Sequence, residues 1–521
     1  MVFFVEHHGQ LAAASSGSAL LDATGTAPIS DAEFSSGTPY DSLPLRAIVP
    51  PLPIERLGDP AFLAAHRVRA AYMAGSMANG IASCELVEAL AGEGLLASFG
   101  AAGLTVAEVS RAIDRLGALG NRPRAFNLIH SPNEPAHEAA VVDLYLRRSV
   151  RLVEASAYLD LTLPVVRYRV AGIHVDATGR VVAPNKIIAK ASRVEVAARW
   201  FSPPPEKLLA ELVRSDEITP DQAALARRIP MAQDLTAEAD SGGHTDNRPA
   251  ITLLPTMLAL RDRLQAEQGY EEPLRVGAAG GIATPASAAA AFAMGAAYIV
   301  TGSINQACIE SGTSDTVRRM LAEAQQADVI MAPAADMFEM GIKLQVLRRG
   351  TMFAMRAARL YELYRTHNAL EEIPAAERAA LEKTIFRAPL EEIWRQTQAF
   401  FAERDPAQVE RAAGDPKHKM ALVFRWYLGL SSVWANRGEA SRQVDYQVWC
   451  GPAMGALNEW TKDSPLALPE NRNVATLAWN LLYGAAVTTR IAAARNQGVA
   501  LPTEATQARP RGMAELTEHL P

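Results

Sequence analysis

A glycine-rich turn between an apolar segment and a helix-like segment is the strongest chemical signal in the sequence. In the run RVGAAGGIATP the apolar stretch ends at Ala279, Gly280 and Gly281, and Thr284 followed by Pro285 has the pattern of a helix start. Glycines at such a junction let backbone N–H groups approach an anion, and the helix start adds the positive end of its dipole. The pattern therefore indicates a phosphate-binding turn.

A second turn of the same kind follows one helix later, where the segment YIVTGS ends in Thr301, Gly302 and Ser303. In α/β barrels the loops after strands seven and eight commonly bind phosphate. By our count the two turns follow the seventh and eighth strands. Tight helix–strand packing without a ligand would also use glycine, but two such turns at consecutive strand ends favour a phosphate site.

One histidine is placed where it can transfer protons. The segment ADSGGHTDNRP follows the sixth apolar stretch, and in it Gly243 precedes His244, so that the ring is presented from a flexible loop. A lone histidine is usually structural, but this one sits at a strand end, where barrel enzymes keep their catalytic residues. Its unperturbed pKa of about 6.5 suits proton transfer near neutral pH.

Small and polar residues stand at three other strand ends. A small-residue loop can lie under an aromatic cofactor ring, an asparagine amide can bond the polar edge of the ring, and a lysine can stabilise negative charge on a reduced cofactor. An ordinary ion pair would also explain the lysine. The residues, on the first, third and fifth segments, are Gly75, Ser76, Met77, Ala78, Asn127 and Lys190.

These residues need a scaffold that brings strand ends together. Eight short apolar segments alternate with helical patterns, and they look buried on both faces, as parallel strands covered by helices should be. This alternation predicts a (β/α)8 TIM barrel, although an open doubly wound sheet would alternate as well. The eight segments are residues 70–76, 95–100, 125–130, 151–157, 186–192, 234–240, 274–279 and 298–303.

The chain as a whole divides into four predicted regions. We expect an N-terminal arm over residues 1–55, the barrel over 56–320, an added C-terminal α-helical subdomain over 321–497 and a flexible tail over 498–521. Within the barrel, residues 167–184 have the pattern of an inserted β-hairpin. Strand signals nearly vanish after about residue 320, and the helical subdomain is therefore expected to act as a lid or docking layer.

Composition and missing motifs exclude several function classes. Lys and Arg total 51 against 57 Asp and Glu, so a net charge of −6 offers no broad basic field for nucleic acid or an anionic membrane. No run of about 18 apolar residues could cross a bilayer. Three scattered cysteines predict neither a metal site nor a disulfide framework and suit the reducing cytoplasm. The Rossmann, P-loop, nucleophile-elbow and zincin motifs are absent.

The three strand-end segments SGGH, VGAAGGIATP and VTGSINQAC together resemble the FMN-dependent barrels of the nitronate monooxygenase (2-nitropropane dioxygenase) superfamily. Within that superfamily the chain is most similar to the PfaD family of trans-acting enoyl reductases. The similarity to this narrower group rests on PAADMFEMGIK (333–343), LYELYRT (360–366), FRWYLGLSS (424–432) and DYQVWCGPAMGA (445–456). The resemblance covers roughly residues 55–460.

The resemblance implies FMN as the cofactor and assigns roles to the strand-end residues. His244 is the implied catalytic histidine, Lys190 has an implied catalytic and flavin-contacting role, and Asp240 replaces the relatives' longer glutamate in their EAGGH segment. Ser76 stands where the relatives have a second glycine under the flavin. The implied cofactor-binding residues are Gly75, Ser76, Met77, Ala78, Asn127, Lys190, Gly243, Ala279, Gly280, Gly281, Thr301, Gly302 and Ser303.

The implied reaction is reduction of an α,β-unsaturated thioester held on an acyl carrier protein. NADPH would supply hydride through FMN to Cβ, and His244 or a water would protonate Cα, with the turn after it (Thr245, Asp246, Asn247) as a further proton source. The implied partners are polyketide or polyunsaturated fatty acid synthase modules, and the resemblance leaves a homodimer open.

Three interpretations stay open on the sequence alone. Basic residues in 343–365 could dock an acidic carrier protein, while a solvated helix face with intrachain ion pairs would carry the same charges. A nitronate monooxygenase would use the same barrel and FMN with His244 as base and oxygen as oxidant. A flavin-free scaffold that holds synthase modules together is the non-enzymatic alternative.

Overall fold

The predicted barrel is confirmed. In the computed structural model, which describes residues 1–7, 10–16, 43–130, 132 and 134–520, eight parallel strands close into a barrel. All eight predicted segments are strands of this barrel. In chain order they are β4 (Tyr72–Ala74), β5 (Leu96–Phe99), β6 (Ala125–Ile129), β7 (Leu152–Ser156), β10 (Lys186–Ala191), β11 (Asp234–Glu238), β13 (Arg275–Ala279) and β14 (Ile299–Thr301).

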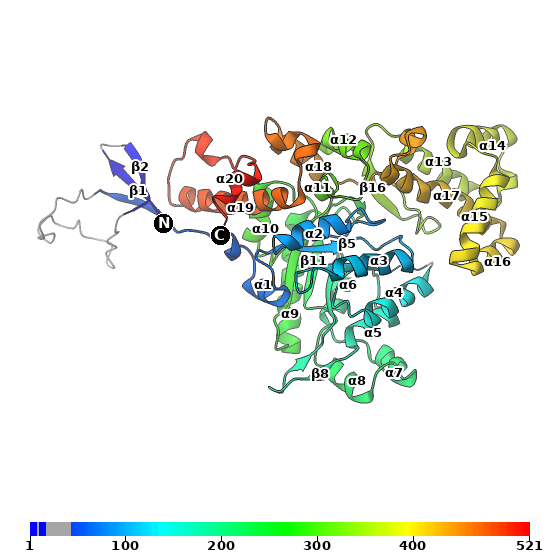
Figure 1. The fold of residues 1–521 in the computed structure, drawn as a ribbon, viewed down its shortest axis with the longest axis horizontal. Helices are drawn as coiled ribbons and strands as arrows, with labels where there is room; N and C mark the ends of the chain where they lie inside the picture. Colours follow the sequence, from blue (N-terminus) through cyan, green and yellow to red (C-terminus); the bar gives the residue numbers. More distant parts are fainter. Residues whose placement is uncertain (8–9, 17–42, 131, 133, 521) are drawn as a thin grey trace, which may run out of the picture.

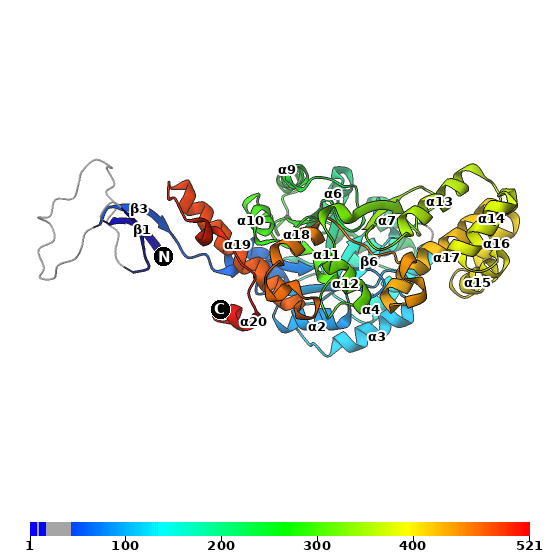
Figure 2. The ribbon, with the colours of Figure 1, turned by 90° about the horizontal axis from the view of Figure 1, so that it is seen from above.

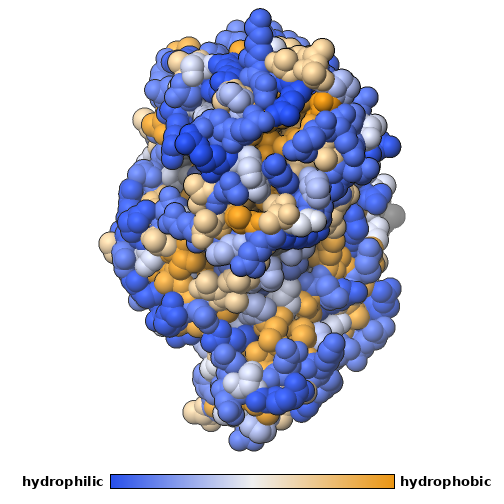
Figure 3. Space-filling model, turned by 90° about the vertical axis from the view of Figure 1, so that its right-hand side faces the viewer, coloured by the Kyte–Doolittle hydropathy of each residue, from blue (hydrophilic) through white to orange (hydrophobic). Residues whose placement is uncertain are grey.

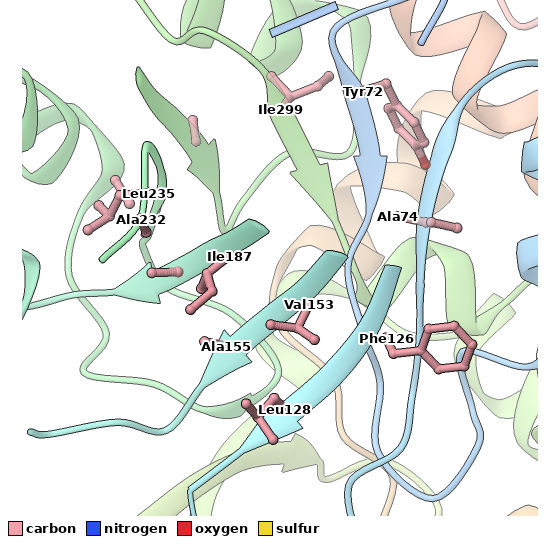
Figure 4. Packing of buried hydrophobic residues seen from close by; sticks show 14 of the residues in the cluster. Tyr72, Ala74, Phe126, Leu128, Val153, Ala155, Ile187, Ala232, Leu235 and Ile299 are labelled. Atoms are coloured by element: carbon pink, nitrogen blue, oxygen red, sulfur yellow. The ribbon is translucent and has the colours of Figure 1, made fainter. Parts of the chain in front are cut away.

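Helices surround the barrel and bury one face of each strand. On β7, Val153 and Ala155 pack in the hydrophobic layer between strands and helices (Figure 4), so the residue between them, Glu154, faces the barrel interior. The same alternation turns Asn127 and Lys190 inward on their strands. The covering helices include α2 (Cys84–Gly92), α3 (Val106–Gly117), α4 (Pro135–Arg147), α5 (Leu163–Val170), α6 (Val194–Phe201), α9 (Ala250–Gln268) and α10 (Pro285–Ala293).

The amino-terminal end of the barrel is closed by aromatic packing and a buried ion cluster. Phe62, on helix α1 (Pro60–His66), stacks on Tyr298 with ring centroids 4.1 Å apart. The Asp234 carboxylate accepts two hydrogen bonds from Arg275, at 2.6 and 2.9 Å, and lies 2.9 Å from His66 Nε2. All charges of this cluster are therefore satisfied within the chain, away from the strand ends that carry the predicted site.

The inserted hairpin is shorter than the sequence predicts. Strands β8 (His174–Val175) and β9 (Val181–Val182) pair antiparallel around the expected turn, but residues 167–170 belong to helix α5. Thr162 caps that helix by accepting a hydrogen bond from Val165 N, and a proline in the first turn favours the helical start. The alternating apolar pattern suggests a long strand, but the capped helix start at Thr162 makes residues 167–170 helical instead. Helices α7 (Glu206–Arg214) and α8 (Pro220–Ala226) are further additions before the sixth barrel strand.

A helical subdomain with its own core projects from the barrel. It comprises the hairpin of β15 (Val329–Pro333) and β16 (Lys343–Leu347) together with α13 (Phe353–Thr366), α14 (Ala375–Leu381), α15 (Leu390–Arg404), α16 (Pro406–Gly414) and α17 (Pro416–Arg437). Their buried residues form a cluster separate from that of the barrel. Figures 1 and 2 show α14 to α17 at the end of the molecule opposite the N-terminal strands. The sequence does not predict the two strands of the hairpin.

The later helices belong to the barrel rather than to this subdomain. Helix α19 (Val474–Asn496) lies along α10, and its buried residues join the barrel's hydrophobic cluster, as do those of α18 (Ala453–Thr461). The segment expected as a flexible tail packs beside them. Leu516 of α20 (Met513–Thr517) is buried, and Arg511 N donates to Asn480 Oδ1. The helical layer expected over residues 321–497 thus consists of two differently packed parts.

The N-terminal arm contains regular structure where it is described. Strands β1 (Val2–His7), β2 (Gln10–Ala14) and β3 (Leu45–Val49) form an antiparallel sheet in the order β2-β1-β3. Val49 and Ala47 pack against the end of α19. Much of the arm predicted over residues 1–55 lies outside the described residues. Within the described part of the chain, no helix is long and apolar enough to cross a membrane.

Candidate functional site

A single cavity of about 740 Å³ at the carboxyl ends of the barrel strands brings the predicted site residues together. Every one of them lines it, although they come from several strand ends that are far apart in the sequence. The helical subdomain covers the cavity from the other side. The predicted residues that line it are Gly75, Ser76, Met77, Ala78, Asn127, Lys190, Gly243, His244, Ala279, Gly280, Gly281, Thr301, Gly302 and Ser303.

The turn after β13 is a close-packed glycine cradle. Gly280 has φ +87°, and a Cβ there would lie 2.6 Å from the Ala239 carbonyl carbon and 2.8 Å from Asp240 O. A Cβ at Gly281 or Gly302 would instead meet nothing within 4 Å. Position 280 therefore has no room for a side chain, because the neighbouring backbone is too close. Gly281 and Gly302 instead leave open space on the side of the cavity.

The turn after β14 is joined by a segment that sequence reasoning did not assign to the site. Gly451 N donates a hydrogen bond to Ser303 Oγ at 3.1 Å, and helix α18 begins two residues later with Ala453, which also lines the cavity. A Cβ at Gly242 would lie 2.9 Å from Cys450 N, so the loop carrying His244 abuts the same segment. Three backbone segments thus converge beside Ser303.

The loop after β4 is fixed to the barrel by backbone hydrogen bonds. Gly75 N donates to Thr301 O at 2.9 Å, and Ser76 N donates to Glu154 Oε2 at 2.7 Å. Glu154 is fully buried, and its second carboxylate oxygen, Oε1, has no hydrogen-bond partner within the described residues. The Asn127 amide nitrogen donates to Glu154 O and Ser156 Oγ. A buried carboxylate therefore lies directly beneath the loop that forms one wall of the cavity.

Lys190 is held as a cation at the side of the cavity. Its Nζ lies 3.1 Å from Glu238 Oε1. Burial lowers the pKa of Lys190, but the carboxylates of Glu238 and Glu154 outweigh burial and raise that pKa above its usual range. The ordinary ion pair considered from the sequence thus exists, and it keeps a positive charge on the cavity wall at neutral pH.

His244 is held by the small sheet that reaches over from the helical subdomain. Strand β12 (Gly243–His244) pairs antiparallel with β16, with His244 opposite Leu344. His244 Nε2 lies 3.2 Å from Asp336 Oδ1, and both side chains line the cavity and are about one-third exposed. Burial lowers the pKa of His244, but the Asp336 carboxylate more than offsets it, so the pKa is raised above the usual histidine value.

Asp240 and the three residues after His244 organise the loop and are not among the residues that line the cavity. Asp240 Oδ1 accepts hydrogen bonds from Gln345 Nε2 at 2.9 Å and from Asn247 Nδ2 at 2.7 Å. Asp246 pairs with Arg193. The side chains of Thr245, Asp246 and Asn247, suggested from the sequence as a further proton source, lie outside the cavity lining and are engaged in the loop.

The roof of the cavity is largely apolar, with Arg404 and Arg425 among its polar residues, and it opens at one side. Phe400 of α15 lines the cavity and is 53% exposed, which marks an opening to the surface there. Beside it, Arg404 pairs with Glu134 at the start of α4, and Asn79 Nδ2 donates to Ser432 of α17 at 3.0 Å. These two contacts connect roof and barrel. The other roof residues include Phe401, Leu422, Trp426, Leu430, Val433 and Trp449.

Half of the basic residues proposed to dock a carrier protein are engaged within the chain. Arg356 pairs with the buried Asp445, and Arg359 pairs with Glu362 of its own helix and with Glu377 of α14. Arg349 lies 3.7 Å from a carboxylate oxygen of Glu323 and equally far from one of Asp328. The alternative of intrachain ion pairs is therefore correct for three of the six basic residues in this stretch, which are Lys343, Arg348, Arg349, Arg356, Arg359 and Arg365. Hydrophobic patches interrupt the hydrophilic surface at this end of the molecule (Figure 3).

Comparison with known protein families shows which family the barrel belongs to. Residues 64–388 match the nitronate monooxygenase family. The chain belongs to this family. Residues 367–446 also match the inserted helical domain of [acyl-carrier-protein] S-malonyltransferase, so the helical subdomain resembles a separate kind of domain. Members of the nitronate monooxygenase family are flavin-dependent oxidoreductases.

The similar proteins place the chain among the PfaD-like members of the family, as the sequence predicts. The crystal structure of the enoyl reductase domain of MlnA, from the macrolactin biosynthesis cluster of Bacillus amyloliquefaciens, matches with a TM-score of 0.80 and 37% identity over 86% of this chain and 100% of that chain. This similarity extends over both the barrel and the helical subdomain.

The curated relatives are polyunsaturated fatty acid synthase subunits and polyketide biosynthesis proteins. One of the polyunsaturated fatty acid synthase subunits of Thraustochytrium sp. is 50% identical over 457 residues, 86% of this chain and 30% of that protein. Polyketide biosynthesis protein PksE of Bacillus subtilis is 44% identical over 435 residues, 83% of this chain and 56% of that protein. The chain thus spans between 23% and 56% of the length of the curated relatives it matches.

Proposed function

We propose that this PfaD-like chain is an FMN-dependent enoyl reductase that uses NADPH to reduce α,β-unsaturated thioesters on an acyl carrier protein, acting in trans for a polyketide or polyunsaturated fatty acid synthase. The observation that carries the proposal is the convergence of glycine turns, Lys190 and His244 on one cavity. The enoyl reductase domain named for the matched MlnA structure supports the reaction type. The names of the synthase relatives support the pathway class.

The cavity fits FMN in size and in the chemistry of its walls. Its volume of about 740 Å³ lies in the range of about 300–1,000 Å³ that is usual for ligand pockets. The open faces of Gly281 and Gly302, with Ser303 beside them, suit the phosphate end. The loop of Gly75, Ser76, Met77 and Ala78 suits the ring system, because it places no bulky charged side chain on the cavity wall.

The chain's own residues define the chemistry that the cavity can support. When bound, FMN supplies hydride transfer between NADPH and Cβ of the enoyl thioester. Lys190, held cationic by Glu238, stabilises negative charge that develops near the cavity wall. The apolar roof of Phe401, Trp426 and Leu430 excludes water from the reacting carbons.

His244 supplies the proton that completes the reduction. Hydride arriving at Cβ pushes electrons into the thioester, and Cα must then take a proton for the carbon–carbon bond to become single. Because the pKa of His244 is raised, the ring is more often protonated near neutral pH than a free histidine. The loop held by β12 and β16 presents this ring at the cavity wall.

The helical subdomain suits a large, tethered substrate. Its match to an inserted helical domain of a carrier-protein-dependent transferase supports a carrier protein as the partner. The opening at Phe400 gives a path by which a pantetheine arm could reach the cavity. The hydrophobic patches at this end of the molecule suit protein contact (Figure 3).

A nitronate monooxygenase is the second candidate, because the family match over residues 64–388 bears that name and His244 could abstract a proton from a nitroalkane. The long apolar roof favours the reductase, since a small nitronate needs no such surface. The reductase would use the enoyl thioester as its oxidant, whereas the monooxygenase would use oxygen. Activity assays can therefore distinguish the two functions.

The proposal is tested in two assays: the FMN-loaded protein is reduced with NADPH without oxygen and then given a crotonyl-loaded carrier protein, and, separately, the oxidised FMN-loaded protein is given a nitronate in the presence of oxygen. We expect a crotonyl-loaded carrier protein to reoxidise the flavin rapidly and to be converted to the butyryl form. A nitronate with oxygen should give little turnover. Rapid nitronate oxidation without enoyl reduction would assign the second function instead.

A further inference from the structure

We infer that Asp336 is a positioning residue for His244: it binds the ring through Nε2, so that Nδ1 is the nitrogen that exchanges a proton with the substrate. The inference deepens the proposed function and rests on it. It starts from geometry, because His244 Nε2 lies 3.2 Å from Asp336 Oδ1 and both residues line the cavity. His244 Nδ1 makes no hydrogen bond within the described part of the chain.

Asp336 is held rigidly enough to fix the ring. It lies in the loop between β15 and β16, whose ends are joined by a hydrogen bond from Ala334 N to Ile342 O at 2.9 Å. Two residues beyond it, Phe338 is fully buried and packs edge-on against Tyr361 and Phe424 in the core of the helical subdomain. A carboxylate fixed in this way selects one tautomer of its histidine partner.

The charges around the pair favour a protonated ring and an ionised carboxylate. Burial raises the pKa of Asp336, but His244 and then Arg425 of α17 outweigh it and lower that pKa. The other charged groups that face His244 are Glu238 of β11, which raises its pKa, and Lys190 of β10, which lowers it. The effects of Glu238 and Lys190 oppose each other, so Asp336 decides the direction.

This arrangement ties the proton donor to the roof. His244 comes from the barrel, whereas Asp336 comes from a hairpin whose core is that of the helical subdomain. The ring is therefore correctly held only when the helical subdomain is packed on the barrel. A barrel without this hairpin would present the same histidine with neither its tautomer nor its charge fixed.

The test replaces Asp336 by asparagine, which keeps the shape of the side chain and removes its charge. With [13Cε1]histidine-labelled protein, the His244 resonance is assigned as the one missing from His244→Gln. We expect its titration midpoint to fall by about 1 pH unit in Asp336→Asn. The high-pH limb of kcat/KM for the crotonyl carrier protein should move down by the same amount, because loss of the carboxylate leaves the ring protonated only at lower pH.

Asp328→Asn is the matched control. Asp328 precedes β15 on the same hairpin unit, lies outside the cavity lining, and its carboxylate accepts from Gln325 N. We expect it to change neither the His244 titration nor the pH profile. An unchanged His244 midpoint in Asp336→Asn, or an equal shift in Asp328→Asn, overturns the inference.

A measurement on the unaltered protein decides the matter even if Asp336→Asn does not fold. The ring 15N shifts of His244 at high pH report the neutral tautomer, and we expect the proton on Nε2. A proton on Nδ1 overturns the inference. Since neither ring measurement needs substrate, they stand apart from the enoyl reduction assay, whose failure would count only against the proposed function.

Discussion

The two ends of the barrel both bury charged groups, but they satisfy them differently. At the amino end, Asp234 accepts from two nitrogens of Arg275 and contacts His66, and each of these side chains is at most about 5% exposed. At the carboxyl end, His244 and Asp336 are about one-third exposed, and Glu154 keeps an oxygen without a partner within the described residues.

The buried charges at the amino end of the barrel serve the stability of the fold, and the charged groups at the carboxyl end serve the chemistry of the site. Charges whose partners all lie within the chain contribute to folding, whereas groups left partly unpaired at the strand ends await a ligand. Barrel enzymes divide their two ends in this way, with chemistry at the carboxyl face. Substitutions at the two ends should therefore separate stability from catalysis and cofactor binding.

Asp234→Ala should have the largest effect, and it should fall on stability. The change leaves the buried Arg275 guanidinium without its partner, which costs about 3–5 kcal/mol of unfolding free energy. Urea unfolding followed by circular dichroism measures the loss. The surface pair Glu206–Arg227 gives the control, because Glu206→Gln should leave the unfolding midpoint unchanged. Equal unfolding curves for Asp234→Ala and the unaltered protein would mean that the cluster is not structural.

His244→Gln should instead leave stability intact and slow the reaction. Loss of the proton donor should reduce the rate of flavin reoxidation by the crotonyl carrier protein by about 100-fold. Reduction of the flavin by NADPH should be unaffected, since it needs no proton on a carbon atom of the substrate. Stopped-flow absorbance measures both half-reactions, and equal slowing of the two would remove His244 from its assigned role.

Gly280→Ala should have the smallest effect of the three substitutions, and it should weaken the binding of FMN. A Cβ would lie within 2.6–2.8 Å of backbone atoms of Ala239 and Asp240, and φ +87° is unfavourable for alanine, so the turn must shift. We expect the Kd for FMN to rise by about tenfold. Gly179→Ala, at the exposed tip of the inserted hairpin, is a control with a similar positive φ. Tight FMN binding by Gly280→Ala would argue against a phosphate turn.

Much of the fold could be predicted because its signals are local. Each of the eight strands is a short, nearly continuous apolar segment, and Gly280 and Gly302 punctuate consecutive strand ends. Convergence of strand ends then follows from the closure of the barrel, which explains why the implied catalytic and cofactor-binding residues line the same cavity. The narrower segments of the resemblance also locate the helical subdomain.

What could not be predicted depends on contacts between distant segments. Asp336 lies 92 residues from His244 and reaches it only through the pairing of β12 with β16. The sequence does contain a weaker signal for Glu154, which is the one charged residue within the strand segment LVEAS (152–156). The strands β15 and β16 were missed because short apolar runs among long helical patterns do not distinguish strand from helix.

The central claim, that the cavity at the strand ends holds FMN, is tested most directly by measuring flavin binding to the unaltered protein. The protein is unfolded in acid to release any flavin, refolded without it and titrated with FMN while flavin fluorescence is followed. The account predicts stoichiometric binding that quenches the fluorescence and weakens in Gly280→Ala. A folded protein that carries no flavin and leaves the fluorescence of added FMN unchanged would contradict it.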